Sequence, residues 1–330
     1  MIRHHSFFTQ SSFLFYSSDI STYRSELMGW SIIWIMMLHF TFTQITPLGF
    51  IAQYGFAGVD VFMFVSGLGL FYSLNKDCRI LNFYKKRLLR IFPTYYIIGF
   101  FINLVITHDS FGTYLLRYST IGFWTGGIYA DWFIPSIIAL YLIAPLFYYI
   151  IEKKWFWLII LIVTTILLLS LFFADKTILD RSHFFLLYRI PAFIFGMICA
   201  YWIKNDKPTH FYFFILLVGL PFFIYFFPLQ HQFYNFKYFS LAFLLPLFVL
   251  CFVIISKYLT IISTLMSKMG QSSLEIYLIQ SIFFSLVISG KTASYENYHD
   301  ILTILMIIIS TSLGIVSHCL IEKFVTQRLQ

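Results

Sequence analysis

Long apolar stretches follow one another along almost the whole chain, and short polar loops separate them. A helix that crosses a bilayer needs about 20 predominantly apolar residues, and each stretch is close to that length. The pattern predicts ten membrane-spanning helices, over residues 28–46, 56–74, 88–107, 133–151, 155–173, 184–203, 211–228, 238–256, 272–289 and 301–320. We therefore expect an all-α fold, a polytopic transmembrane helical bundle.

Composition supports this assignment and argues against a soluble domain. Hydrophobic residues make up 60% of the chain and charged residues only 11%, against about 25% in an ordinary soluble domain. Residues 1–27 lack an apolar core followed by small residues, so they predict a retained tail and not a cleaved signal peptide. Without an internal repeat or a flexible linker, we expect a cytoplasmic tail over 1–27, one membrane domain over 28–320 and a second cytoplasmic tail over 321–330.

The distribution of cations predicts the orientation of the bundle. Alternate loops carry 16 Lys and Arg residues on one side of the membrane and five on the other, with Arg189 inside a helix. The side with the excess stays in the cytoplasm, so both termini are predicted to be cytoplasmic. The net charge of +8 is explained by this asymmetry and does not indicate nucleic-acid binding.

Three ionisable residues within the predicted spans are candidates for function: His39, Asp60 and Glu275. A charge at bilayer depth costs several kcal/mol unless it is paired or hydrated. His39 and Asp60 lie at similar depths, roughly 7–11 Å from the outer surface, on helices joined by a short loop. We expect them to meet, with the carboxylate orienting the imidazole as a general base. The alternative is that His39 and Asp60 only help to pack neighbouring helices. For Glu275, a structural role and a functional role are equally open.

A basic segment, "FYKKRLLRIFP", begins the third predicted span. Arg87 and Arg90 are three residues apart and project from one helix face, where two guanidinium groups suit phosphate oxygens. The alternative is that these cations, including Lys86, only anchor the helix at lipid phosphates.

Seven segments in this order resemble the integral-membrane acyltransferase family 3, which includes bacterial surface-polysaccharide O-acetyltransferases. They are "LMGWSIIWIMMLHF", "GFAGVDVFMFVSGLGLF", "FYKKRLLRIFPTYYI", "DWFIPSIIALYLIAPLF", "RIPAFIFGM", "MGQSSLEIYLIQ" and "LIEKFV". The resemblance implies an enzyme of a bacterial cytoplasmic membrane that moves an acyl group, usually acetyl, from acyl-CoA to a hydroxyl of a surface glycan or its lipid-linked precursor. His39 would be its base or nucleophile, with Asp60 as the second catalytic residue, and Arg87, Arg90 and Lys86 would bind acyl-CoA. Residues for substrate contact or structure would be Ser66, Trp132, Arg189, Glu275, Tyr277 and Glu322.

Two positions depart from the family pattern. Met28 stands where many members carry an arginine, whose contribution Arg24 could supply, and Gln280 stands where many carry a histidine. Both departures bear on activity and on the substrate.

The mechanism and the class of protein leave alternatives open. His39 could deprotonate the acceptor hydroxyl directly or form an acyl-histidine intermediate. The four cysteines and nine histidines show no metal-ligand spacing, so no metal and no permanently bound cofactor are expected. A polytopic transporter or flippase of a glycan intermediate, a membrane glycan polymerase and a scaffold are the alternatives. Expected partners are acyl-CoA, the glycan acceptor and membrane lipids, and a homo-oligomer stays open.

Overall fold

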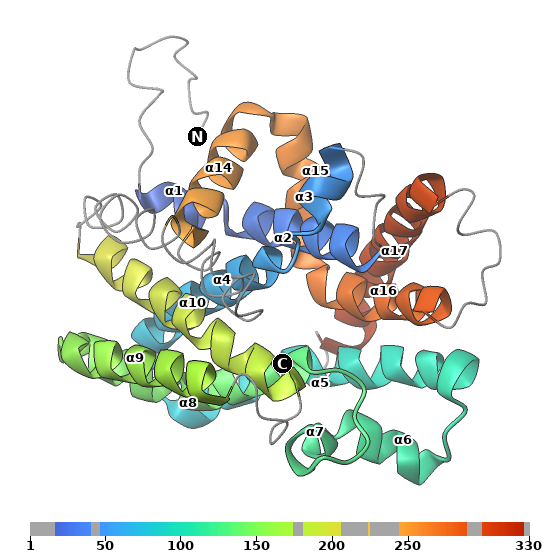
Figure 1. The fold of residues 1–330 in the computed structure, drawn as a ribbon, viewed down its shortest axis with the longest axis horizontal. Helices are drawn as coiled ribbons and strands as arrows, with labels where there is room; N and C mark the ends of the chain where they lie inside the picture. The colour runs from blue at the N-terminus through green and yellow to red at the C-terminus, as the bar shows by residue number, and fades with distance from the viewer. Residues whose placement is uncertain are drawn as a thin grey trace.

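The structure is a computed structural model that describes residues 17–40, 47–173, 181–205, 224, 244–288 and 299–326. Helices fill most of these ranges, and no strand occurs in them, which confirms the all-α prediction. Figure 1 shows long helices crossing at varied angles, with α2 and α4 between the other helices of the bundle.

The helices closely follow the apolar stretches of the sequence. The helical elements, in chain order, are α1 (Ser17–Thr22), α2 (Arg24–His39), α3 (Pro47–Ala52), α4 (Ala57–Lys76), α5 (Ile80–Ile102), its π-helical continuation η1 (Asn103–Thr107), α6 (Phe111–Tyr118), α7 (Ile121–Thr125), α8 (Phe133–Glu152), α9 (Phe156–Phe173), α10 (Arg181–Lys204), α14 (Leu245–Tyr258), α15 (Thr260–Gln271), α16 (Ser273–Ile288), α17 (His299–Ile321) and the π-helix η4 (Glu322–Thr326).

Within the described ranges, five helical segments are long and apolar enough to cross a membrane: Ala57–Lys76, Ile80–Thr107, Phe133–Glu152, Leu186–Lys204 and Ile301–Phe324. Shorter apolar segments coincide with three further predicted spans: Phe156–Ile166, Leu245–Tyr258 and Ser273–Phe284. The predicted span over 211–228 lies outside the described residues except for position 224. The structure thus supports an integral membrane protein, while the count of ten spans and the cytoplasmic termini stay predictions.

Helices α4 and α10 pack closely because glycines face the partner backbone. A Cβ atom at Gly67 would overlap the carbonyl of Phe193, and one at Gly196 would overlap the carbonyl of Phe64. Small residues allow helix backbones to approach in this way, which strengthens van der Waals contact where no water drives association. This contact fixes the position of α4, one wall of the cavity described below.

Helix α2 is fixed in the same way against α15, a helix that the hydrophobic pattern did not predict. A Cβ at Gly29 would overlap the Met266 carbonyl, and one at Gly270 would overlap the carbonyl of Ser25. Helix α2 also contacts α4, α14, α16 and α17, so it is surrounded by other helices of the bundle. Its position is therefore set by tertiary contacts on several sides.

The segment between α5 and α8 folds into the short helices α6 and α7. Asp109 accepts a 2.5 Å hydrogen bond from Nε of Arg117, and this bond holds the pKa of the Asp109 carboxyl below its usual value. The Ser110 side chain accepts from the backbone N–H of Thr113 and caps α6. These contacts order a connection that the sequence predicts as an external loop.

Candidate functional site

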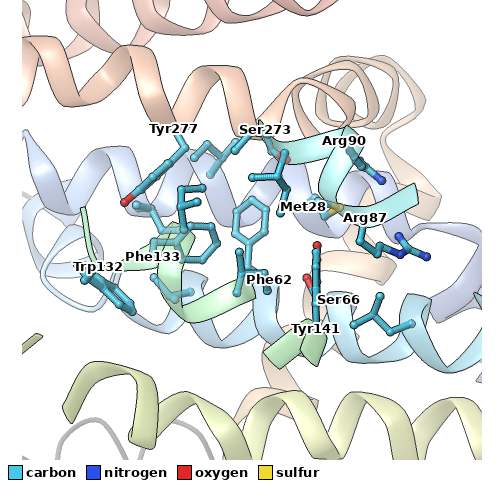
Figure 2. Close-up of a pocket in the computed structure, with 18 of the residues that line it drawn as sticks. Met28, Phe62, Ser66, Arg87, Arg90, Trp132, Phe133, Tyr141, Ser273 and Tyr277 are labelled. Atoms are coloured by element: carbon cyan, nitrogen blue, oxygen red, sulfur yellow. The ribbon is translucent and has the colours of Figure 1, made fainter. Parts of the chain in front are cut away.

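A cavity of about 110 Å³ runs among α2, α4, α5, α8 and α16. Figure 2 shows side chains from these helices converging on it, with Arg87 and Arg90 toward one end and Trp132, Phe133 and Tyr277 toward the other. Its two ends thus differ in chemistry: one is cationic and the other is aromatic.

Five residues of α2 line this cavity at intervals of four, four, three and four: Arg24, Met28, Ile32, Ile35 and His39. These intervals keep the side chains on one face of a helix with 3.6 residues per turn. Because each residue adds about 1.5 Å, Arg24 and His39 are separated by ~22 Å along the helix axis. One rigid helix therefore holds the cationic end and the histidine a fixed distance apart.

Three guanidinium groups meet at the cationic end: Arg24 from α2 and the predicted pair Arg87 and Arg90 from α5. Arg24 and Arg87 are half-buried, and Arg90 is exposed at the mouth. The Nε atoms of Arg24 and Arg87 are buried without a hydrogen-bond partner, and no salt bridge to these three side chains is found in the described part of the chain. Three like charges that form no salt bridge among the described residues make a strong site for a ligand anion.

Apolar side chains line the middle of the cavity. Met28, Phe62 and Ile137 are among the apolar residues of this lining, and Ser66 adds one hydroxyl. Figure 2 places Phe62 and Ser66 between the arginines and the aromatic end. Such a lining suits a flexible, largely uncharged arm better than a second charged group.

His39 is the last residue of α2, at the deep end of the cavity. Its ring packs on Phe284 of α16, with 4.9 Å between ring centroids. The Gln280 amide lies close enough to the imidazole to act on it electrostatically, but neither of its polar atoms makes a hydrogen bond of ordinary geometry to a described residue.

The structure corrects the expected contact between His39 and Asp60. One Asp60 oxygen, Oδ2, accepts a 2.5 Å hydrogen bond from Arg189 of α10, and the other, Oδ1, has no partner among the described residues. Asp60 and Arg189 are 1% and 2% exposed, so each buried charge needs the other. Matched depth did not bring Asp60 to His39 because the carboxylate faces α10, and Asp60 ties α4 to α10.

A hydrogen-bonded carboxylate, Asp131, lies behind the aromatic end of the cavity. It accepts bonds from the hydroxyl of Tyr95 at 2.8 Å, the backbone N–H of Ile134 at 2.8 Å and the hydroxyl of Tyr277 at 3.4 Å. Burial raises the pKa of the Asp131 carboxyl. The network positions Tyr277, whose ring lines the cavity, and bonds the first turn of α8.

The other predicted site residues divide between two cavities. Ser66, Trp132 and Tyr277 line the cavity with His39, whereas Lys86, Glu275 and Glu322 line a second, polar cavity that shares Arg90. Sequence reasoning missed Asp131, for which its position just before an apolar helix was the available signal. It also gave Arg24 only a conditional role.

Comparison with known families identifies the fold family. A family model described as an acyltransferase domain, Acyl_transf_3, matches residues 27–322. The chain belongs to the acyltransferase family 3. No curated protein and no solved structure matches it. The match confirms the resemblance found in the sequence and includes every lining residue of the cavity except Arg24.

As an acyltransferase, the chain must bring an activated acyl group and a nucleophile together away from water. The cavity offers an anion site, an apolar passage and a histidine, in that order along α2. A histidine is the side chain best suited to exchange a proton near neutral pH.

Proposed function

We propose that this acyltransferase transfers an acyl group, in the first instance acetyl, from acyl-CoA to a hydroxyl of a cell-surface glycan or of its lipid-linked precursor. It would act in the cytoplasmic membrane of a bacterium. The observation that carries the proposal is one cavity with three arginines at one end, which form no salt bridge among the described residues, and His39 at the other.

The cationic end matches the phosphates of coenzyme A. Arg87 and Arg90 project from the same face of α5, and Arg24 approaches from α2. Guanidinium groups donate paired hydrogen bonds to phosphate oxygens, and each charged bond is worth about 1.5–3 kcal/mol. With the phosphates held there, the pantetheine arm would follow the apolar passage and carry the thioester toward His39.

The chemistry requires a base and little else, because a thiolate is a good leaving group. Neutral His39 takes the proton of the acceptor hydroxyl as that oxygen attacks the thioester carbonyl. The tetrahedral intermediate collapses, the C–S bond breaks, and the imidazolium returns its proton to the departing thiolate. The products are an ester and free coenzyme A, so protons and electrons balance without a metal or a redox partner.

The acceptor would approach from the aromatic end. Trp132 and Tyr277 present ring surface there, and Asp131 holds the Tyr277 hydroxyl. Aromatic surfaces combine a large apolar area with a polar group at one edge, which suits the mixed faces of a sugar.

The test is transfer of labelled acetyl from acetyl-CoA to isolated surface glycan by the purified protein in liposomes. A positioned general base typically contributes about 10²–10⁴-fold to the rate, so His39→Ala should lose at least 100-fold. His108→Asn is a matched control, because His108 is exposed with a positive φ of 50° that asparagine tolerates.

A folded His39→Ala protein that keeps more than half of the wild-type rate would refute the assigned chemistry. A label that stays covalently on the wild-type protein when the glycan is omitted would favour the acyl-histidine route over direct transfer.

A further inference from the structure

A second cavity of about 350 Å³ lies among α5, α16, α17 and η4, beside the arginine cluster. Seven of its nine lining residues are polar or charged, in contrast to the apolar passage. Six of these residues have charged, amide or imidazole side chains: Lys86, Arg90, Gln271, Glu275, His318 and Glu322.

The two cavities meet at Arg90 and Leu274, which line both. A ligand whose anionic centre lies at Arg90 can therefore extend in two directions. One direction is narrow and apolar and leads toward His39, and the other is wider and polar. A ligand that fills both must have an apolar arm and a polar end joined through an anionic group.

The polar cavity contains a buried acceptor without a donor. Glu275 is 4% exposed, and its Oε1 receives the Thr94 hydroxyl at 3.4 Å and faces Nδ1 of His318 at 3.1 Å. Its Oε2 is buried with no hydrogen-bond partner in the part of the chain that the structure describes. His318 Nε2 in turn lies 3.5 Å from Glu322 Oε2, so the cluster is held in place while one acceptor stays available.

The rim supplies the opposite charge. Lys86 is exposed, one turn before Arg90 on α5, and lines the same cavity. An acceptor in the interior and a cation at the rim match a base with an exocyclic amine that is attached to a phosphorylated ribose. The Gln271 amide adds both a donor and an acceptor for such a base.

We propose that this second cavity binds the 3′-phosphoadenosine end of the acyl-CoA, with Glu275 accepting from the adenine amine and Lys86 contacting the 3′-phosphate. This inference rests on the proposed function and deepens it. The arginine cluster would then hold the pyrophosphate at the junction of the two cavities. Selection of the whole coenzyme over a shorter phosphopantetheine thioester would come from the second cavity.

The test is isothermal titration of the purified full-length protein with CoA, dephospho-CoA and 4′-phosphopantetheine. Wild type should bind CoA at least about tenfold more tightly than 4′-phosphopantetheine, since each lost charged hydrogen bond costs about tenfold or more. Lys86→Gln should weaken the binding of CoA by about tenfold and leave the affinity for dephospho-CoA unchanged. Glu275→Gln should weaken the binding of CoA and of dephospho-CoA several-fold and leave the affinity for 4′-phosphopantetheine unchanged.

Lys85→Gln is the matched control, because Lys85 is an exposed neighbour that lines neither cavity. Equal wild-type affinities for CoA and 4′-phosphopantetheine, or equal losses for all three ligands in either variant, would overturn the nucleotide site while leaving acyl transfer in place. A wild-type protein that binds none of the three would refute the proposed donor itself.

Discussion

Arg24 offers the sharpest test of the anion site, because its side chain lowers the stability of the protein when no ligand is bound. Its Nε is buried with no hydrogen-bond partner among the described residues, and Arg87 and Arg90 add like charge beside it. An unsatisfied buried polar group costs about 1–3 kcal/mol, more when it is charged. Arg24→Met keeps most of the side-chain length and removes the charge, so it should leave the melting temperature of the ligand-free protein unchanged or higher.

The same variant should bind acetyl-CoA more weakly than the wild type does. Loss of one charged hydrogen bond of about 1.5–3 kcal/mol corresponds to roughly 10- to 100-fold in affinity. At 100 times the wild-type Kd, the ligand stabilises the wild-type protein by about 2.7 kcal/mol, whereas a 30-fold weaker variant gains only about 0.9 kcal/mol. Melting curves with and without acetyl-CoA measure both effects on one sample.

Gly69 provides a second way to disturb Arg24 without removing its charge. A Cβ atom at Gly69 would overlap the Arg24 guanidinium group. In Gly69→Ala the flexible end of Arg24 must move, while α4 gains about 1 kcal/mol of helix propensity. We expect weaker acetyl-CoA binding with an intact fold. Gly112→Ala is the matched control, since a Cβ there meets nothing within 4 Å.

Two results would refute this account of Arg24. A marked fall in the ligand-free melting temperature of Arg24→Met would make the residue a structural support. An unchanged affinity for acetyl-CoA in both Arg24→Met and Gly69→Ala would remove Arg24 from the donor site and leave Arg87 and Arg90 alone there.

Two further predictions address the scaffold and its orientation. Asp60→Ala should destabilise the protein by about 3–5 kcal/mol because it leaves Arg189 buried without its carboxylate, and the double variant Asp60→Leu, Arg189→Met should recover much of the loss in a thermal melt. A double variant no more stable than Asp60→Ala would contradict the role of this pair in joining α4 to α10. Reporter fusions near Arg117 should be external and those after Lys154 cytoplasmic, and a cytoplasmic signal near Arg117 would reverse the orientation.

The sequence predicts the long helices well because their signal is local. A run of about 20 apolar residues is sufficient to identify a spanning helix, and α4, α5, α8, α10 and α17 each contain one. Helix α15 was missed because Thr260–Gln271 has only 12 residues and several polar ones. Its position depends on close contact with α2 through Gly29 and Gly270, which no local window can reveal.

The candidate site was predictable only along single helices. The positions of Arg24, Met28 and His39 on one face of α2 follow from their spacing. The partner of Asp60 does not, because Arg189 lies 129 residues away and the direction of a side chain around its helix depends on tertiary packing. Depth in the membrane could be estimated from sequence, but rotation about the helix axis could not.

The arginine cluster also bears on the choice between enzyme, transporter and scaffold. Two of the three guanidinium groups beside this cavity, those of Arg24 and Arg87, bury an Nε atom that has no hydrogen-bond partner among the described residues. This reduces stability in the ligand-free state, and a scaffold has no use for such a cost. A flippase must open its cargo site to each side of the membrane in turn, whereas this cavity places its cations at one end and His39 at the other. The phosphates of an acyl-CoA donor would form hydrogen bonds with these arginines. The bonds would last from the arrival of the donor until free coenzyme A leaves. The asymmetry of the cavity therefore favours acyl transfer.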